Sequence, residues 1–212
     1  MKFAPEGYPF IVFFAALTAV AYFIGSAAPA VVPFILLLFM FYFFRDPERA
    51  TPAEDDIFVS PADGRVIQIQ QVLEEKYLQG NAVEISIFMS PLNVHVNRAP
   101  CDGTVEAVVH TPGKFLSAFK PEASLMNENI AMLLKGAFYK VLVRQVAGAI
   151  ARRAVCRVRP GDSLKKGERY GMIKFSSRLD IFLPPKTEIK VKLGDKVKAG
   201  ETILGRINKE KF

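Results

Sequence analysis

The chain has 212 residues and half of them are apolar, which suits one compact domain with a short appendage and excludes a disordered scaffold. Its formal net charge of +7 comes without a Lys/Arg-rich block or a nucleic-acid-reading motif, so the charge favours an anionic membrane surface over nucleic acid. The two cysteines, Cys101 and Cys156, have neither metal nor disulfide spacing and predict a reducing compartment.

The first 44 residues hold two dense apolar runs, Phe10 to Gly25 and Val31 to Phe44, which are separated by the small-residue break Ser26-Ala-Ala-Pro-Ala30. This pattern predicts a helical hairpin. Each run is shorter than the roughly 20 residues that cross a bilayer upright, so two thin spans, a re-entrant hairpin and a shallow interfacial hairpin all fit. A second apolar run and a single preceding basic residue, Lys2, do not fit a cleaved signal peptide, so we expect the anchor to be retained.

Basic residues flank the hairpin on both sides, with Lys2 before the first run and Arg45 and Arg49 after the second. The positive-inside tendency then places both ends of the hairpin on the cytoplasmic side of the cell membrane. We therefore expect a membrane-anchoring hairpin over residues 1–50 and a body over residues 51–212 that faces the cytoplasm.

Beyond Pro52 the sequence breaks into short strand-like runs separated by Gly, Pro and Asp. The pattern predicts a β-rich body without the long crossover helices of an α/β fold. A helix is expected only around Ala123 to Leu134, where the apolar spacing is irregular. The predicted strands are Arg65 to Gln70, Ala82 to Phe88, Val105 to His110, Tyr139 to Gln145 and Ala154 to Val158.

Two internal echoes run through this body. Ala62-Asp-Gly-Arg-Val66 matches Cys101-Asp-Gly-Thr-Val105, and each is a turn dipeptide that leads into a strand. Gly161-Asp-Ser-Leu-Lys-Lys-Gly-Glu-Arg-Tyr-Gly171 matches Gly194-Asp-Lys-Val-Lys-Ala-Gly-Glu-Thr-Ile-Leu-Gly205 in the order Gly-Asp, apolar, Lys, Gly-Glu, Gly. Such turns resemble the half-repeats of biotinyl and lipoyl carrier domains, which build a flattened barrel from two similar β-halves. The expected fold is therefore mainly β, a barrel-sandwich body behind an N-terminal hydrophobic helical hairpin.

The second echo flanks the segment from Met172 to Pro184, which carries the adjacent serines Ser176 and Ser177. Adjacent serines in an alternating strand usually mark a turn or a bulge, so the pair alone indicates no chemistry. The stretch Phe175-Ser-Ser-Arg-Leu-Asp180, however, resembles the self-cleavage site of the short bacterial and archaeal phosphatidylserine decarboxylases, which read Phe-Gly-Ser-Arg, an apolar residue, then Asp. Other stretches similar to that family cover nearly the whole chain: Tyr42-Phe-Phe-Arg-Asp-Pro-Glu-Arg49, Ser60-Pro-Ala-Asp-Gly64, Phe88-Met-Ser-Pro-Leu-Asn-Val-His-Val-Asn-Arg-Ala-Pro100, Pro112-Gly-Lys-Phe115 and Ala147-Gly-Ala-Ile-Ala-Arg-Arg153.

The resemblance implies a proenzyme that cuts itself between Ser176 and Ser177 and converts Ser177 into a covalent pyruvoyl group. The large chain, residues 1–176, and the small chain, residues 177–212, would stay associated. The mature enzyme would decarboxylate the membrane lipid phosphatidylserine to phosphatidylethanolamine, with the pyruvoyl carbonyl drawing electrons from the breaking bond, so neither pyridoxal phosphate nor a metal is expected.

Serine is a weak nucleophile and needs a neighbouring base, which a carboxylate commonly orients. By motif, the resemblance assigns these roles in self-processing to His95 and Asp63. On their own, Asp63 before Gly64 is an ordinary turn residue and His95 fits a packed strand histidine. His110, the only other histidine, lies in an alternating strand and is expected to be structural.

Two positions depart from the family pattern. Arg98 stands where longer relatives have a second histidine, which leaves open whether His95 serves both self-cleavage and protonation or whether Arg98 binds the substrate's phosphate or carboxylate. Ser176 replaces the usual glycine before the reactive serine, and a side chain there restricts the backbone angles that glycine reaches at little cost. The carbonyl of residue 176 and the attacking hydroxyl of Ser177 are both kept, so cleavage is still expected between these two residues. A cut shifted by one residue, with Ser176 as the nucleophile, is a less favoured alternative.

Other functions fit parts of the sequence. An ether-linked archaeal lipid carries the same phosphoserine head and would react in the same way. Lys174 could receive biotin or lipoate as a carrier lysine, although its neighbours lack the usual Met-Lys-Met or Asp-Lys-Ala setting. If Ser176 blocked maturation, the body would be a non-catalytic membrane-tethered module. The sequence leaves the oligomeric state open, so a homo-oligomer stays among the alternatives.

Overall fold

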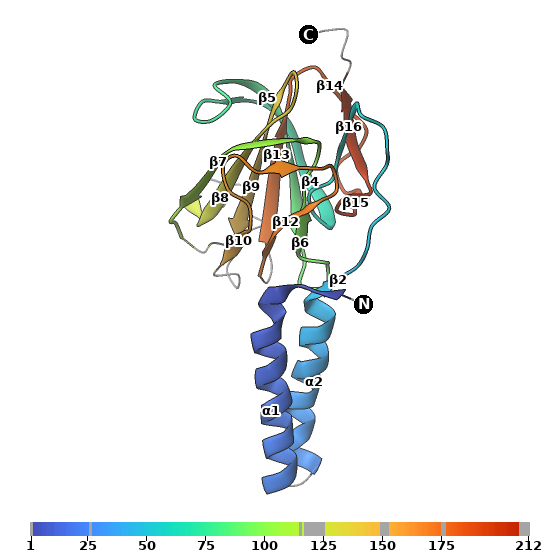
Figure 1. The fold of residues 1–212 in the computed structure, drawn as a ribbon, viewed down its shortest axis with the longest axis vertical. Helices are drawn as coiled ribbons and strands as arrows, with labels where there is room; N and C mark the ends of the chain where they lie inside the picture. The colour runs from blue at the N-terminus through green and yellow to red at the C-terminus, as the bar shows by residue number, and fades with distance from the viewer. Residues whose placement is uncertain are drawn as a thin grey trace. The chain divides into compact units, whose positions relative to one another are not determined.

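The structure, a computed structural model, describes residues 2–25, 27–114, 116, 126–148, 153–174 and 177–207. The chain divides into two compact units, residues 1–48 and 49–212. In the first unit, strand β1 (Lys2–Phe3) pairs antiparallel with β2 (Arg45–Asp46), and a short 3-10 turn, Pro5–Gly7, leads into the helices α1 (Tyr8–Ile24) and α2 (Ala27–Phe43). These two apolar helices confirm the helical hairpin that the sequence predicts (Figure 1).

The break between the two helices is shorter than predicted. Ala27 to Ala30, expected in the break, form the first turn of α2, and Ser26 lies outside the described residues. A proline such as Pro29 is tolerated in a first helical turn, because the amide it lacks would have no partner within the helix there. No residue of α1 is buried, and the stretch Pro5–Ile24 is long and apolar enough to cross a membrane.

The second unit is built from antiparallel strands, which confirms the prediction of a mainly β fold (Figure 1). Its large sheet has eight strands in the order β11-β7-β8-β9-β13-β5-β4-β15, and two three-stranded sheets have the orders β10-β12-β6 and β14-β16-β3. The likeness to carrier domains stays a prediction. The strands are β3 (Ile57–Val59), β4 (Gly64–Glu74), β5 (Gly80–Met89), β6 (Val96–Arg98), β7 (Gly103–Thr111), β8 (Asn129–Lys135), β9 (Lys140–Ala147), β10 (Ala154–Cys156), β11 (Ser163–Leu164), β12 (Arg169–Ile173), β13 (Ser177–Leu183), β14 (Thr187–Ile189), β15 (Lys196–Val197) and β16 (Ile203–Ile207).

The helix expected around Ala123 to Leu134 is wrong where the structure describes it, because Asn129–Lys135 form strand β8 between β7 and β9. Met132 and Leu134 pack in the main core, while Ala131 and Leu133 pack in a second cluster on the other face of the sheet. A strand that is apolar on both faces loses the alternation by which a strand is recognised in a sequence.

The main hydrophobic core lies between one face of the large sheet and the two small sheets. Large-sheet residues such as Ile85, Ile87 and Leu179 meet Phe58 and Leu204 from the β14-β16-β3 sheet. Cys101 is buried in this core, and burial raises the pKa of its thiol to about 12, which keeps the thiol protonated and unreactive.

The two sequence echoes occupy equivalent places in the sheet. In one half, β15 pairs with the start of β4 through Val197 and Gly64; in the other, β11 pairs with the start of β7 through Leu164 and Gly103. The glycines that open the two long echoes, Gly194 and Gly161, both have positive φ and donate to the Val66 and Val105 carbonyls at 2.8 Å. The body is therefore an internal duplication with matching backbone hydrogen bonds.

Gly64 allows β4 to approach β5 closely, because a Cβ at this position would lie 2.2 Å from the Phe88 carbonyl oxygen. We expect Gly64→Ala to lower the free energy of unfolding by about 1–3 kcal/mol through overpacking against backbone. Gly80→Ala on the neighbouring strand is the matched control, because its nearest atom would be 3.8 Å away, and it should stay within about 0.5 kcal/mol. Urea unfolding of the two variants measures the difference, and equal losses would contradict this view of the strand contact.

Candidate active site

Ser177 is the first residue of β13, the strand that lies between β5 and β9 in the large sheet. It pairs with Met89 on one side and Ala147 on the other, and all seven residues of β13 are buried. Its hydroxyl donates to the Met89 sulfur at 3.4 Å. The predicted partner in the cut bond, Ser176, lies outside the described residues.

Alternation along β13 sends consecutive side chains to opposite faces of the sheet. Leu179 and Ile181 join the main core, so Ser177 faces the same way. Arg178 and Asp180 face the other way, where Arg178 Nε donates to Asp180 Oδ1 at 2.5 Å and Arg178 Nη2 donates to Ser86 Oγ at 2.7 Å. The first side chain after Ser177 is therefore fixed by a buried ion pair to its own strand and a hydrogen bond to β5.

Glu84 completes this network on β5. Its Oε1 lies 3.6 Å from Arg178 Nη2, and its Oε2 accepts a 2.7 Å hydrogen bond from Gln70 Nε2. Burial raises the pKa of the Glu84 carboxyl, and the negative charge of Asp180 adds to the rise, against the opposing effects of Gln70, Arg178 and Arg144. A 670 Å³ pocket lined in part by Glu84, Arg144 and Arg178 lies on this face, away from the Ser177 hydroxyl.

His95 is fully buried in the segment between β5 and β6. A turn fixes this segment, because Asn93 Oδ1 accepts hydrogen bonds from Ser90 N at 2.9 Å and Ser90 Oγ at 2.8 Å. His95 Nδ1 lies 3.0 Å from the Asn93 carbonyl oxygen, which can only accept, so Nδ1 carries the proton in the neutral ring. Nε2 is then the nitrogen with a lone pair, and His95 has the tautomer that a base acting through Nε2 requires.

Met89 and Asn97 connect Ser177 to the His95 segment. The Met89 sulfur accepts from Ser177 Oγ and also lies 4.0 Å from Asn97 Nδ2. Asn97 Oδ1 accepts from Gln145 Nε2 of β9 at 2.8 Å, which fixes the amide. Asn97, Met89 and Gln145 were not predicted from the sequence, because contacts between side chains of different strands are known only once the pairing of the strands is known.

The Asp63 carboxylate is paired with Arg49, a residue that the sequence analysis interpreted as a basic flank of the hairpin. Arg49 Nη2 donates to both carboxylate oxygens of Asp63, at 3.0 and 2.8 Å, and Ala199 N donates to Asp63 Oδ1 at 2.8 Å. In the sequence, Arg49 counted only as a basic flank of the hairpin, yet its side chain is 8% exposed and lies 3.5 Å from Glu201 Oε2. The role of Arg49 as the partner of a buried carboxylate becomes visible only in the folded structure.

The turn that carries Asp63 is tied to the strand that follows His95. The Pro61 carbonyl accepts from Arg98 N at 3.0 Å and from Asn97 Nδ2 at 3.4 Å. Three stretches that are far apart in the sequence, those with Asp63, His95 and Ser177, are thereby linked through β6. These stretches carry a hydroxyl, an imidazole with a defined tautomer and a buried carboxylate, the three group types that acyl chemistry at a serine uses. That the three side chains act together stays a prediction.

The remaining candidates lie apart from the serine hydroxyl or are fixed by other groups. Arg98 is buried and its Nη1 donates to the Gly167 carbonyl at 2.8 Å, so the structure gives it a bond to the turn before β12; the predicted substrate contact stays a prediction. His110 Nε2 lies 3.3 Å from Glu128 Oε1 with its side chain 54% exposed. Lys174 is half-buried after β12, and its amide donates to the Arg153 carbonyl at 3.2 Å. Within the described residues, no three His, Cys, Asp or Glu side chains gather as metal ligands would.

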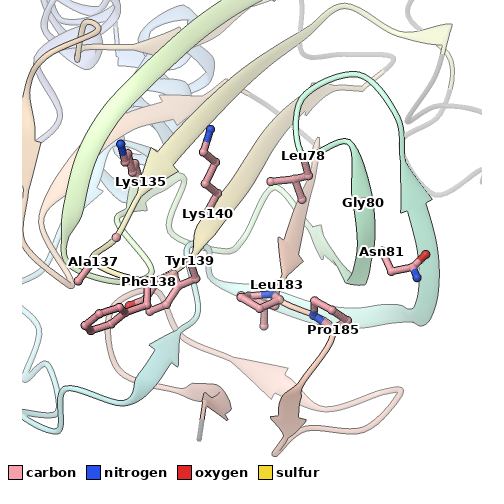
Figure 2. Close-up of a pocket in the computed structure, with 12 residues that line it drawn as sticks. Leu78, Gly80, Asn81, Lys135, Ala137, Phe138, Tyr139, Lys140, Leu183 and Pro185 are labelled. Atoms are coloured by element: carbon pink, nitrogen blue, oxygen red, sulfur yellow. The ribbon is translucent and has the colours of Figure 1, made fainter. Parts of the chain in front are cut away.

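A 460 Å³ pocket lies at the opposite end of β13 and is a separate feature (Figure 2). Leu183 and Pro185 line it together with Lys135, Phe138 and Lys140 from the β8–β9 hairpin. Leu183 is six residues beyond Ser177, which places it about 20 Å away along an extended strand. This pocket therefore takes no part in chemistry at the serine.

Comparison with known proteins gives one consistent family. A family model described as phosphatidylserine decarboxylase matches residues 36–205. Proteins named phosphatidylserine decarboxylase proenzyme match along nearly their whole length. The protein from Desulfotalea psychrophila is 47% identical over 208 residues, with 96% of each chain covered, and that from Syntrophus aciditrophicus is 47% identical over 204 residues, with 95% of this chain and 96% of the relative covered. The protein from Citrifermentans bemidjiense is 48% identical over 209 residues, with 95% of each chain covered.

The raised pKa of Glu84 predicts how stability depends on pH. The folded state binds the Glu84 proton more tightly than the unfolded state does. The free energy of unfolding therefore falls as the pH rises above 4.5, the ordinary pKa of this carboxyl, and through its raised pKa in the folded state. Glu84→Gln resembles the protonated form, so we expect its stability advantage over the parent chain to grow through that range and then level off. Urea unfolding from pH 4 to pH 8 measures this, with Ser177→Ala in both proteins so that the cut expected at this serine does not take place. An advantage that shrinks with rising pH would contradict the sign.

Proposed function

This chain belongs to the phosphatidylserine decarboxylase family, and from that membership we propose that it is a proenzyme that cuts itself before Ser177 and then converts phosphatidylserine to phosphatidylethanolamine and carbon dioxide. The observation that carries the proposal is the place of Ser177. This residue is buried at the first position of a central strand, and its hydroxyl contacts a sulfur that also contacts the strand beyond His95.

Self-cleavage is the reaction that we propose for this serine. Ser177 Oγ attacks the carbonyl carbon of Ser176, the peptide C–N bond breaks, and an ester with a free amino group at residue 177 results. Loss of the Cα proton of residue 177 expels the Ser176 carboxylate and leaves dehydroalanine, whose imine form takes up water and releases ammonia to give pyruvoyl. His95 is our candidate for removing the hydroxyl proton, since its Nδ1–H is directed to Asn93 and its Nε2 lone pair can accept.

A pyruvoyl group formed from Ser177 would lie at the buried start of β13, beside the Met89 sulfur. A pyruvoyl group at this position supplies an electron sink for the bond that releases carbon dioxide. The buried Met89 and Leu179 keep water from the site, and the buried His95 is our candidate for holding or returning a proton.

The two products of the cut should stay together as a large chain, 1–176, and a small chain, 177–212. β13 of the small chain pairs on both sides with strands of the large chain, β5 and β9. β15 pairs with β4, and β16 pairs with β3. The Arg178 bond to Ser86 Oγ adds a buried side-chain contact one residue from the new end.

A membrane lipid as substrate fits the first unit. The stretch Pro5–Ile24 is long and apolar enough to cross a membrane, and α2 is a shorter apolar helix. The basic residues Lys2 and Arg45 beside the hairpin favour a cytoplasmic side for both of its ends. We therefore propose a body, residues 51–212, that works at the cytoplasmic face of the cell membrane.

Substitution of the two adjacent serines tests the cut. Ser177→Ala should remain one uncut and inactive chain, because the nucleophile is lost. Ser176→Ala is the matched control and should still divide, because it keeps the carbonyl that is attacked; Ser176→Gly should mature at least as fast as the parent chain. Intact-mass spectrometry reads the chain masses and the pyruvoyl end. A Ser177→Ala protein that divides here and decarboxylates lipid would refute the assignment of the nucleophile.

Substitution of the two histidines tests the base. His95→Gln should slow self-cleavage by about 10²–10⁴-fold, the usual contribution of a general base. His110→Gln is the matched control, because its side chain is 54% exposed and its Nε2 lies 3.3 Å from Glu128, so cleavage should proceed at the parent rate. Timed sampling of newly made protein, read by intact mass, measures both rates. Equal rates for the two variants would remove His95 from the mechanism.

A further inference from the structure

The internal duplication provides Asp63 with a structural counterpart in the other half of the body. Asp63 and Asp102 hold the same position in the short echo. Ala199 N donates to Asp63 Oδ1 at 2.8 Å, and Lys166 N, at the matching position of the long echo, donates to Asp102 Oδ1 at 2.7 Å. The backbone bond to the aspartate is therefore part of the repeated turn and by itself indicates no chemistry.

The two aspartates differ in the cation that accompanies them. Asp102 pairs with Lys165 at 3.0 Å, and the side chains of the pair are 59% and 83% exposed, which makes it a weak surface ion pair. The side chains of Asp63 and Arg49 are 12% and 8% exposed. Arg49 Nη2 reaches both carboxylate oxygens, so the pair has the short, charge-assisted bonds that fix a carboxylate in orientation.

Arg49 belongs to neither repeat, since it lies in the segment between β2 and β3. A second carboxylate holds its other end, because Nη1 lies 3.5 Å from Glu201 Oε2. The guanidinium is thus fixed between a residue of the proposed large chain, Asp63, and a residue of the proposed small chain, Glu201. Asp102 instead pairs with the exposed Lys165 of its own half.

The Asp63 turn is joined to the segment that carries the proposed base. The Pro61 carbonyl accepts from Arg98 N and from Asn97 Nδ2, and His95 precedes these residues in the same segment. We propose that Arg49 is a positioning residue for self-cleavage, which acts through Asp63 by fixing the orientation of its carboxylate. This inference rests on the proposed function, because it concerns the cut between Ser176 and Ser177.

A double-variant cycle tests whether Arg49 acts through Asp63. The full chain and its Arg49→Gln, Asp63→Asn and doubly substituted variants are made by cell-free synthesis, and intact mass is read over time. We expect Arg49→Gln to slow the cut by at least about 10-fold and Asp63→Asn by about 10²-fold. The double variant should match Asp63→Asn alone, because two residues that act through one group do not add.

Two further variants separate positioning from folding. Arg49→Lys keeps the charge but not the planar fork, so it should cut at a rate between those of the parent chain and Arg49→Gln. Asp102→Asn is the control from the other half and should cut at the parent rate. Each variant is also melted in a Ser177→Ala background; the double variant removes both members of the buried pair and leaves Glu201 its contact with Lys198 at 3.7 Å, so it should stay folded at the assay temperature.

The outcomes distinguish the two levels of the proposal. A parent chain that never divides would overturn the proposed self-cleavage itself. If the parent chain divides, then Arg49→Gln cutting at the parent rate, or effects that multiply in the double variant, would overturn the role of Arg49. Asp102→Asn slowing the cut as much as Asp63→Asn would also overturn it, because both halves would then matter equally.

Discussion

The placement of β13 is the constraint on which the site depends. It is hydrogen-bonded on both sides, to β5 and β9, and all seven of its residues are buried. Because side chains alternate along a strand, Ser177 must face the core if Arg178 and Asp180 form their buried pair on the other face. A slip of one residue would put the arginine into the apolar core and the serine among the charges. The ion pair thus fixes the register of β13, and the register fixes the face of the sheet to which the Ser177 side chain points.

The duplicated turns supply the second layer of order. Each half uses an Asp-Gly turn that closes on a Gly-Glu turn, with the same backbone hydrogen bonds in both places. If only one of the two aspartates takes part in the reaction, the two halves must differ. They differ in the immediate surroundings of the aspartate. One aspartate keeps an exposed lysine, while the other is enclosed with Arg49 and its turn is bonded to the strand that follows the candidate base. The scaffold stays the same in both halves, and the burial of one ion pair distinguishes them.

The sequence predicts this architecture where local chemistry decides it. The apolar hairpin, most strands and the paired echoes follow from hydropathy and turn residues. Prediction failed at β8, where Ala131 and Met132 are buried on opposite faces and the alternation disappears. Arg49 was counted as a membrane flank, since no local pattern tells that its partner lies fourteen residues away. The contacts of Ser177 with Met89, and of Asn97 with Gln145, likewise exist only after strands from distant parts of the sequence pair.

A doubly paired central strand also bears on why a single chain would be made first and divided afterwards, as we propose. A separate small chain, 177–212, would have to insert β13 between β5 and β9, whose edges would be unpaired until it arrived. In the whole chain, the bond before Ser177 keeps β13 close while the sheet forms, at the modest entropic cost of closing a loop. The groups proposed for the cut include His95 and Asp63, and the stretches that carry them are joined to Ser177 only through contacts of β6 and β13 in the folded body. Folding must therefore precede cleavage, and the same pairing that delays the cut holds its two products together afterwards.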